Sequence, residues 1–248
     1  MTKIKQPTLR EWLRQVIRFT PRQFFVMILG NLVLALGVAM FGKAGLGNHP
    51  YHTMLYAAAR LFGGELQSTY ALCQMLLNIP LFLIVFFAGR KHIGLGSILN
   101  MFLLGYAVKG FDALLTVCGV TPAELGGAYL VEWLGLQNIW QLVLELAATV
   151  VISLGISMYQ AGDMGAAPYD ALPLIAVDHG RPFAPWRMLC DGSCLAATIA
   201  LLLVGGWADA PIEARIGLGT VITVFCTGPF IRFFDRTVSC KLAGKPAE

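Results

Sequence analysis

The chain is a series of long apolar runs separated by short polar stretches. Six runs come close to the ~20 residues that an α-helix needs to cross a hydrocarbon layer of ~30 Å. They occupy residues 24–41, 70–88, 98–115, 139–159, 188–205 and 216–233. This pattern predicts an all-α membrane protein with about six transmembrane helices, three in each half of the chain.

Two further apolar segments are too short to cross a membrane. They lie at residues 50–62 and 168–177, each directly after the first long run of its half. A helix of 10 to 13 residues reaches only ~15 to 20 Å. We therefore expect short helices that either re-enter the membrane or lie at its surface, and the sequence alone does not choose between the two.

The two halves of the chain repeat one another. The stretch from Leu36 to Met54 returns without a gap 118 positions later, and the stretch that begins at Gly94 returns 123 positions later. The identical pairs in the first repeated stretch are Leu36/Leu154, Gly37/Gly155, Met40/Met158, Gly47/Gly165, Pro50/Pro168 and Tyr51/Tyr169. The identical pairs in the second repeated stretch are Gly94/Gly217, Leu95/Leu218, Gly96/Gly219, Phe102/Phe225, Gly105/Gly228, Phe111/Phe234 and Asp112/Asp235. Similarity at a nearly fixed period indicates a duplicated unit, and three crossings per unit make the two units inverted repeats.

Basic residues indicate the orientation. They gather before the first run, after the last run and at Arg90–Lys91 between the second and third runs, and cytoplasmic loops are enriched in Lys and Arg. Both termini are therefore expected in the cytoplasm. A model with six crossings places 14 of the 18 basic residues inside, but a model with eight crossings gives the same count. The short lengths of the two extra segments and the tight Arg90–Lys91 cluster favour six.

Composition agrees with a multi-pass membrane protein. Hydrophobic residues make up 57% of the chain and charged residues 13%, which is more apolar surface than a soluble core of this size can hide. The net charge of +4 follows from the basic loops and indicates no nucleic-acid partner. The first apolar run is full length and has no small-residue cleavage site, so we expect no secretory signal.

Five regions follow from these features. Residues 1–22 form a cytoplasmic amphipathic segment with a predicted capping box at Thr8 and Glu11. Residues 23–116 form the first membrane repeat, 117–137 an external loop with Glu124 and Glu132, 138–236 the second repeat and 237–248 a cytoplasmic tail.

The most specific chemistry lies in two Gly/Pro-interrupted loops. Each loop breaks a helix, and a proline at the first helical position then starts a new one. The N-terminus of a helix presents free N–H groups and the positive end of a dipole, which can hold an anionic or polar group. The expected substrate-binding residues are Gly47, Asn48, His49, Pro50, Tyr51, Gly165, Pro168, Tyr169 and Asp170. The alternative is that these turns only connect two elements.

Polar residues within the runs are further candidates, because lipid makes them costly. The possible polar lining consists of Gln74, Glu145, Arg187 and Asp191. Arg187 and Asp191 are one helical turn apart and can pair. Glu145 either carries a coupling proton or has a packing role. Asp170 either compensates the dipole of the helix that starts at Pro168 or contacts the solute.

The residues of these loops resemble a known family. The strings LGVAMFGKAGLGNHPYHTML, LGISMYQAGDMGAAPYDALPL and IGLGTVITVFCTGPFIRFF are similar to those of the YczE/YyaS/YitT-like family of bacterial integral membrane proteins, over nearly all of the chain after Phe24. The second half fits the LGxxPxD-type and GxGTxxxxxxxGPFI patterns of that family. The first half departs from them at His52, Ser97 and Tyr106. The resemblance implies a multi-pass architecture in the bacterial cytoplasmic (inner) membrane and no particular reaction.

Together these features favour a small membrane protein that transports or binds a small polar or anionic solute at the junction of the two loops. The alternative is a non-transport scaffold or regulator that acts through partner proteins. The cysteines have no metal-ligand spacing, and no nucleophile has a nearby base, so we expect no metal, no cofactor and no enzymatic activity. The lipid bilayer and a solute are the expected partners, and a homo-oligomer is compatible with the sequence.

Overall fold

Helices and loops account for the described chain. The computed structural model describes residues 7–8, 10–13, 19–63, 66–120, 139–206 and 216–244, and no strand occurs among them. The first half contains α2 (Pro21–Ala44), α3 (Pro50–Phe62), α4 (Leu66–Ala88), the short turn η1 (Arg90–His92) and α5 (Leu95–Val117). The second half contains α6 (Ile139–Ala161), α7 (Pro168–Asp178), α8 (Phe183–Gly205), α9 (Leu218–Phe234), the π-turn η4 (Asp235–Ser239) and α10 (Cys240–Ala243). The all-α prediction is confirmed, whereas most of the expected external loop lies outside the described residues.

Five helices of the described chain are long and apolar enough to cross a membrane. They are α2, α5, α6, α8 and the unit Leu218–Ala243, which joins α9, η4 and α10. α4 also has 23 residues, but its apolar stretch of described side chains, Leu72–Ala88, is shorter. The multi-pass membrane architecture is therefore present, while six crossings in two inverted repeats stay a prediction.

Two capping boxes precede the first long helix. The predicted box is present: the Thr8 N–H donates to Glu11 Oε2 at 2.7 Å, and the Glu11 N–H donates to Thr8 Oγ1 at 3.4 Å. A second box at Thr20 and Gln23 starts α2 at Pro21, three residues before the apolar run begins. Reciprocal caps of this kind satisfy N–H groups that the first helical turn leaves without partners.

The helices α2 and α6 form the central pair of the bundle. A Cβ atom at Gly155 would lie 2.4 Å from Leu34 N, and one at Gly37 would lie 2.6 Å from Ile152 Cγ1. Glycine therefore lets the two backbones approach where a side chain would separate them, as is common between membrane helices. The residue numbers of the contacts decrease along α6 as they increase along α2, so the two helices are antiparallel.

Each half pairs its first and last long helices in the same direction. In the first half, Asn100 Nδ2 donates to Asn31 Oδ1 at 2.7 Å, and Lys43 Nζ lies 2.8 Å from Asp112 Oδ1. In the second half, Ser157 on α6 donates to Ser239 at 2.7 Å, one turn beyond α9. The buried asparagine and serine contacts hold neighbouring membrane helices together, which is the usual role of such residues.

Each short helix packs on a long helix of the other half: α3 on α8, and α7 on α4. Along the first pair, Ala57 packs with Leu202, and Leu61 lies over Gly205. The residue numbers of the contacts increase along both helices, so α3 and α8 are parallel. α3 also packs on α4, and α7 also packs on α8. The short helices therefore connect the two halves while also covering their own.

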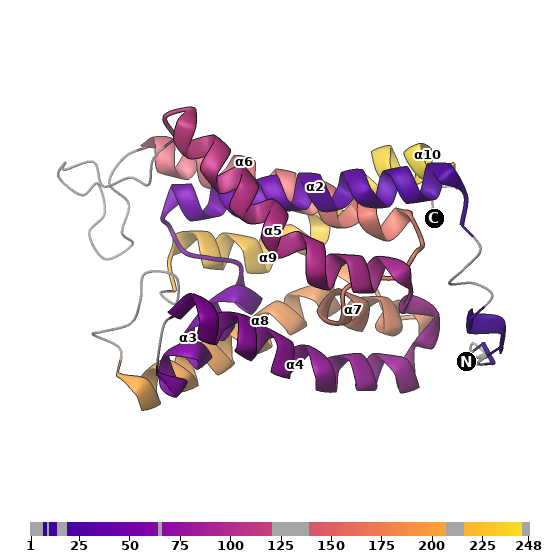
Figure 1. Cartoon of the computed structure of the whole chain (residues 1–248), viewed down its shortest axis with the longest axis horizontal. Coiled ribbons are helices and arrows are strands. Elements are labelled where there is room, and N and C mark those ends of the chain that lie inside the picture. Colours follow the sequence, from indigo (N-terminus) through magenta and orange to yellow (C-terminus); the bar gives the residue numbers. More distant parts are fainter. Residues whose placement is uncertain are drawn as a thin grey trace.

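Several segments that the charge pattern assigns to the cytoplasm share one end of the molecule, at the right of Figure 1. Arg22 donates to the Lys241 carbonyl at 2.7 Å, and Trp12 Nε1 donates to the Ile93 carbonyl at 2.9 Å. His92 bonds Asp178 at 2.7 Å. Burial lowers the pKa of His92, while this hydrogen bond opposes the shift.

The close approach of α2 and α6 makes a packing prediction. Gly155→Ala should lower the free energy of unfolding by at least about 1–3 kcal/mol, because the new methyl group meets backbone rather than a flexible side chain. The matched control is Gly110→Ala on α5, where a Cβ atom meets nothing within 4 Å. That variant should be as stable as the wild type or slightly more stable. Thermal unfolding of the purified proteins measures both, and equal melting temperatures would contradict the packing account.

Candidate functional site

The two predicted loops each end in the N-terminus of a short helix. Pro50 and Pro168 start α3 and α7, and the residues before them, His49 and Ala167, make no side-chain capping bond. The prediction of two proline-started helices after the loops is confirmed. The first N–H groups of both helices therefore point into the protein interior without a side-chain cap of this kind.

The glycines of these loops form two backbone clasps between the halves. In the first clasp, residues 46–47 lie on residues 217–220, and the Gly219 N–H donates to the Leu46 carbonyl at 2.9 Å. In the second clasp, residues 164–165 lie on residues 94–97, and the Gly96 N–H donates to the Met164 carbonyl at 2.6 Å. Each repeated Gly-Leu-Gly motif thus binds the repeated loop of the other half.

A residue with a side chain does not fit the centre of either clasp. Gly47 has φ +119° and Gly165 has φ +103°, which is a backbone region that residues with side chains rarely adopt. A Cβ atom at Gly47 would lie 2.4 Å from Thr220 Oγ1, and one at Gly165 would lie 2.2 Å from Gly94 N. Both glycines therefore hold the halves together and do not line the cavity described below.

The N-termini of α3 and α7 meet at the centre of the molecule. The rings of Tyr51 and Tyr169, which are equivalent in the two repeats, stack with centroids 4.6 Å apart and an interplanar angle of 28°. His49 contacts the edge of Tyr169 with centroids 6.4 Å apart. The two positive helix ends are thus brought to one place.

A buried ion cluster stands beside this contact. The Arg187 side chain on α8 is 1% exposed, and its guanidinium binds the carboxylates of Asp170 and Asp191, the latter at 3.2 Å. Its Nη2 also lies 3.1 Å from His49 Nε2, and its Cζ lies 4.9 Å from the centre of the Tyr169 ring. The predicted Arg187–Asp191 pair is therefore present, as part of a larger network.

Tyrosine hydroxyl groups complete the cluster. Tyr159 donates to Asp170, Tyr169 donates to Asp191 Oδ1 at 2.6 Å, and Tyr51 donates to Asn78 Oδ1 at 3.0 Å. Hydrogen bonds of this kind stabilise a buried carboxylate in its charged form. The cluster is thus built from a fixed set of charged and polar groups with named partners.

The charge of the cluster follows from these contacts. A guanidinium group has only donors, so His49 Nε2 accepts the bond from Arg187 and its ring is neutral. Burial of His49 lowers its pKa, which agrees with a neutral ring. Two carboxylates and one guanidinium then leave one net negative charge, close to the positive N-termini of α3 and α7.

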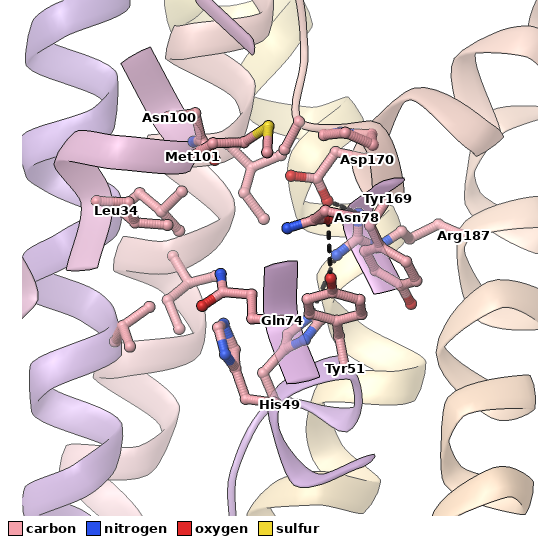
Figure 2. A pocket seen from close by; sticks show the side chains of 17 residues that line it. Leu34, His49, Tyr51, Gln74, Asn78, Asn100, Met101, Tyr169, Asp170 and Arg187 are labelled. Carbon is pink, nitrogen blue, oxygen red and sulfur yellow. Dashed lines mark hydrogen bonds and ion pairs between the residues drawn. The ribbon is translucent and has the colours of Figure 1, made fainter. Parts of the chain in front are cut away.

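A cavity of about 70 Å3 opens beside the cluster. Figure 2 shows Leu34 and Met101 on the side opposite Tyr169 and Arg187. The polar lining consists of His49, Tyr51, His52, Gln74, Asn78, Asn100, Tyr169, Asp170 and Arg187. The apolar lining comes from α2, α5 and α6, with Ala167 and Pro168 at the α7 end. Polar and apolar side chains thus both line the cavity, as is usual for small-molecule sites.

The structure brings most of the expected site residues to this cavity. His49, Tyr51, Pro168, Tyr169 and Asp170 line it, and so do Gln74 and Arg187 from the possible polar lining. The others lie elsewhere. Gly47 and Gly165 are in the clasps, and Glu145 lies against Gly219. Asn48 and Pro50 adjoin His49 without lining the cavity. Asp191 lies behind Arg187.

Tyr159 was not predicted as part of the site. Its hydroxyl group binds Asp170, and its equivalent in the first repeat is Phe41. The equivalent of Asp170 in the first repeat is His52. A hydroxyl group and a carboxylate are thus both present in the second repeat and both absent from the first, which is a signal that comparing the repeats could have revealed.

The clasps predict which loop substitutions are harmful. Gly47→Val and Gly165→Val should each abolish most of the folded protein, because valine neither tolerates these backbone angles nor fits against the opposite segment of the clasp. Pro50→Ala and Pro168→Ala are the matched controls and should remain folded, since alanine is also accepted at a helix start. The yield of monodisperse protein in detergent measures this, and normal yields of both valine variants would contradict the clasps.

Comparisons with known proteins agree with the membrane architecture. Residues 21–236 match the model of a family described as "Family of unknown function (DUF6198)". The chain is 27% identical over 209 residues to the uncharacterized membrane protein YczE of Bacillus subtilis (strain 168), covering 82% of this chain and 81% of that protein. It is 25% identical over 206 residues to the uncharacterized protein YyaS of the same organism, covering 83% and 89%. No solved structure matches. The resemblance noted in the sequence is confirmed, and the chain belongs to the family of unknown function DUF6198.

Proposed function

We propose that this protein binds and transports a small polar solute through the cavity between its two halves. The observation that carries the proposal is the buried ion cluster of Arg187, Asp170 and Asp191 on the cavity wall. Charged side chains inside a membrane domain are costly, and they commonly belong to a pathway for solutes or ions. Packing alone does not require them.

The arrangement of the halves supports the same proposal. The two halves have the same order of one long, one short and two long helices, and their first helices, α2 and α6, are antiparallel. An inverted repeat predicts this relation. Transporters built from inverted repeats place their site at the repeat interface, where broken helices point their N-termini at the solute. The cavity and the N-termini of α3 and α7 stand in that relation.

The charge of the site limits the solute. Asp170 lies in the first turn of α7, and its carboxylate offsets the positive end of that helix. The first turn of α3 contains no acidic residue, so its N-terminus is where an anionic or polar group would bind. The net negative charge of the cluster would repel an anionic solute. A neutral or zwitterionic polar solute has no net charge and would not be repelled in this way. We therefore favour the polar solute and keep the anion as the competing outcome.

A ligand screen on the purified protein tests the proposal. A solute that binds the folded protein at 100 times its dissociation constant adds about 2.7 kcal/mol to its stability. Neutral, cationic and anionic small solutes should be compared by thermal shift. Solutes that raise the melting temperature should then be tested for uptake into proteoliposomes. If no solute raises the melting temperature and a protein co-purifies instead, the alternative of a scaffold or regulator is favoured.

Asp170 gives the first variant prediction for this site. Asp170→Asn leaves Arg187 buried with one carboxylate fewer, and breaking a buried pair in this way typically costs about 3–5 kcal/mol. This loss is larger than the ~0.3–1 kcal/mol expected if Asp170 only compensated the helix dipole. Tyr159→Phe is the milder partner variant, because Phe41 occupies its equivalent position. It should stay folded, lose about 1.5–3 kcal/mol and bind the solute more weakly.

Chemical unfolding of both variants, together with solute titration of Tyr159→Phe, measures these effects. Wild-type stability in both variants, together with wild-type affinity in Tyr159→Phe, would remove Asp170 from the site.

The proposed orientation predicts accessibility. A cysteine introduced at Lys91 should react with a membrane-impermeant reagent only in inside-out vesicles, because Lys91 pairs with Asp178 at the end that we assign to the cytoplasm. Asp112, at the opposite end of the helices, pairs with Lys43, and a cysteine there is the control that should react from outside intact cells. Labelling in the reverse sense would overturn the proposed orientation with cytoplasmic termini.

A further inference from the structure

Glu145 on α6 lies outside the ion cluster in a setting of its own. Its side chain is 0% exposed, and neither carboxyl oxygen has a hydrogen-bond partner among the described residues. The group lies against the start of α9: a Cβ atom at Gly219 would be 1.9 Å from Glu145 Oε1 and 2.9 Å from Oε2. The carboxyl group therefore fills the space that glycine leaves at the first clasp.

Charged groups on the neighbouring elements are already engaged. α2 and α9 both pack on α6. The register of the α2–α6 pair brings Lys43 to the level of Glu145, but Lys43 binds Asp112 and Thr116 on α5. The first turns of α9, from Leu218 to Thr223, carry no charge, and the next titratable groups on that helix are Cys226 and Arg232. His49, which follows the clasp loop, is bound to Arg187.

An ionised carboxylate without a donor or a counter-charge is far more costly in an apolar interior than a neutral one, so such groups keep their proton. The equivalent residue in the first repeat is Met27, which is also fully buried. The same position of the fold therefore holds an uncharged side chain in one half and a carboxyl group in the other. Packing accounts for the methionine, but it does not require an acid.

We propose that Glu145 is a proton-binding site that keeps the first clasp closed while it is protonated. Loss of the proton leaves a carboxylate that needs N–H donors, and the carboxyl group touches Gly219, whose N–H holds the Leu46 carbonyl at 2.9 Å. Competition for that N–H loosens the clasp. His49 follows Leu46 by three residues and lines the cavity, so the proton on Glu145 is linked to the shape of the cavity.

The test compares the wild type with Glu145→Gln and Glu145→Met in the full-length purified protein. Glutamine has the shape of the neutral acid, and methionine is the residue at the equivalent position of the first repeat. The unfolded carboxyl group releases its proton at about pH 4, whereas the folded state holds it to a higher pH, so the stability of the wild type falls as pH rises from about 4 until the folded protein also loses the proton. We expect the melting temperature of the wild type to drop by several degrees relative to Glu145→Gln over this range, to level off above it, and to agree with that of Glu145→Gln below it.

Infrared spectroscopy supplies an independent readout. The carbonyl stretch of a protonated carboxyl group should be present in the wild type at neutral pH and absent from Glu145→Gln. Asp235→Asn is the matched carboxylate control, since Asp235 is partly exposed and lies 3.6 Å from Arg232. Its band and its alkaline stability should be those of the wild type.

Hydrogen exchange tests the link to the clasp. At alkaline pH the peptide that contains Gly219 should exchange faster in the wild type than in Glu145→Gln. Equal exchange overturns the coupling, and parallel melting curves or a missing infrared band overturn the proton site. Recovery of alkaline stability by sodium but not by choline would show a metal cation in place of the proton. None of these measurements uses a solute, so their outcome is separate from that of the transport proposal.

Discussion

The burial of one guanidinium group is the constraint on which the centre of this protein depends. Arg187 is almost wholly removed from solvent inside a membrane domain, where an unpaired charge is very costly. Its partners come from three separate places: Asp191 on the same helix, Asp170 in the first turn of α7 and His49 in the loop before α3. Satisfying this one side chain therefore requires both short helices to start at the centre of the molecule.

The backbone clasps make this arrangement possible. Each clasp fixes the loop before a short helix by hydrogen-bonding it to the start of the last long helix of the other half. The short helices in turn pack on α8 and α4, again in the other half. Glycine is needed at the contacts because the chains meet backbone to backbone. The repeated glycines thus determine where the loops lie, and the residues beside them provide the chemistry.

The two halves share a framework but differ in their polar residues. The second half has Tyr159, Asp170 and Glu145 where the first has Phe41, His52 and Met27. Each of the three lies at a place where the framework is common to both repeats, and each adds a hydroxyl or carboxyl group in the interior. The central cluster and the carboxyl group at the first clasp therefore mark places where the two halves differ.

The sequence by itself determined the helices, the duplicated halves, the two proline-started short helices and the Arg187–Asp191 pair. All of these are local features: apolar periodicity, proline at the first helical position and a spacing of one helical turn leave a direct mark in the chain. Only the tertiary structure decided that Arg187 also meets Asp170 and His49, 17 and 138 residues away. It also decided that Gly47 and Gly165 serve the clasps and that Glu145 lies on Gly219 rather than at the cavity. The physical reason is that these contacts depend on how the two halves pack against one another, and no spacing within either half encodes that packing.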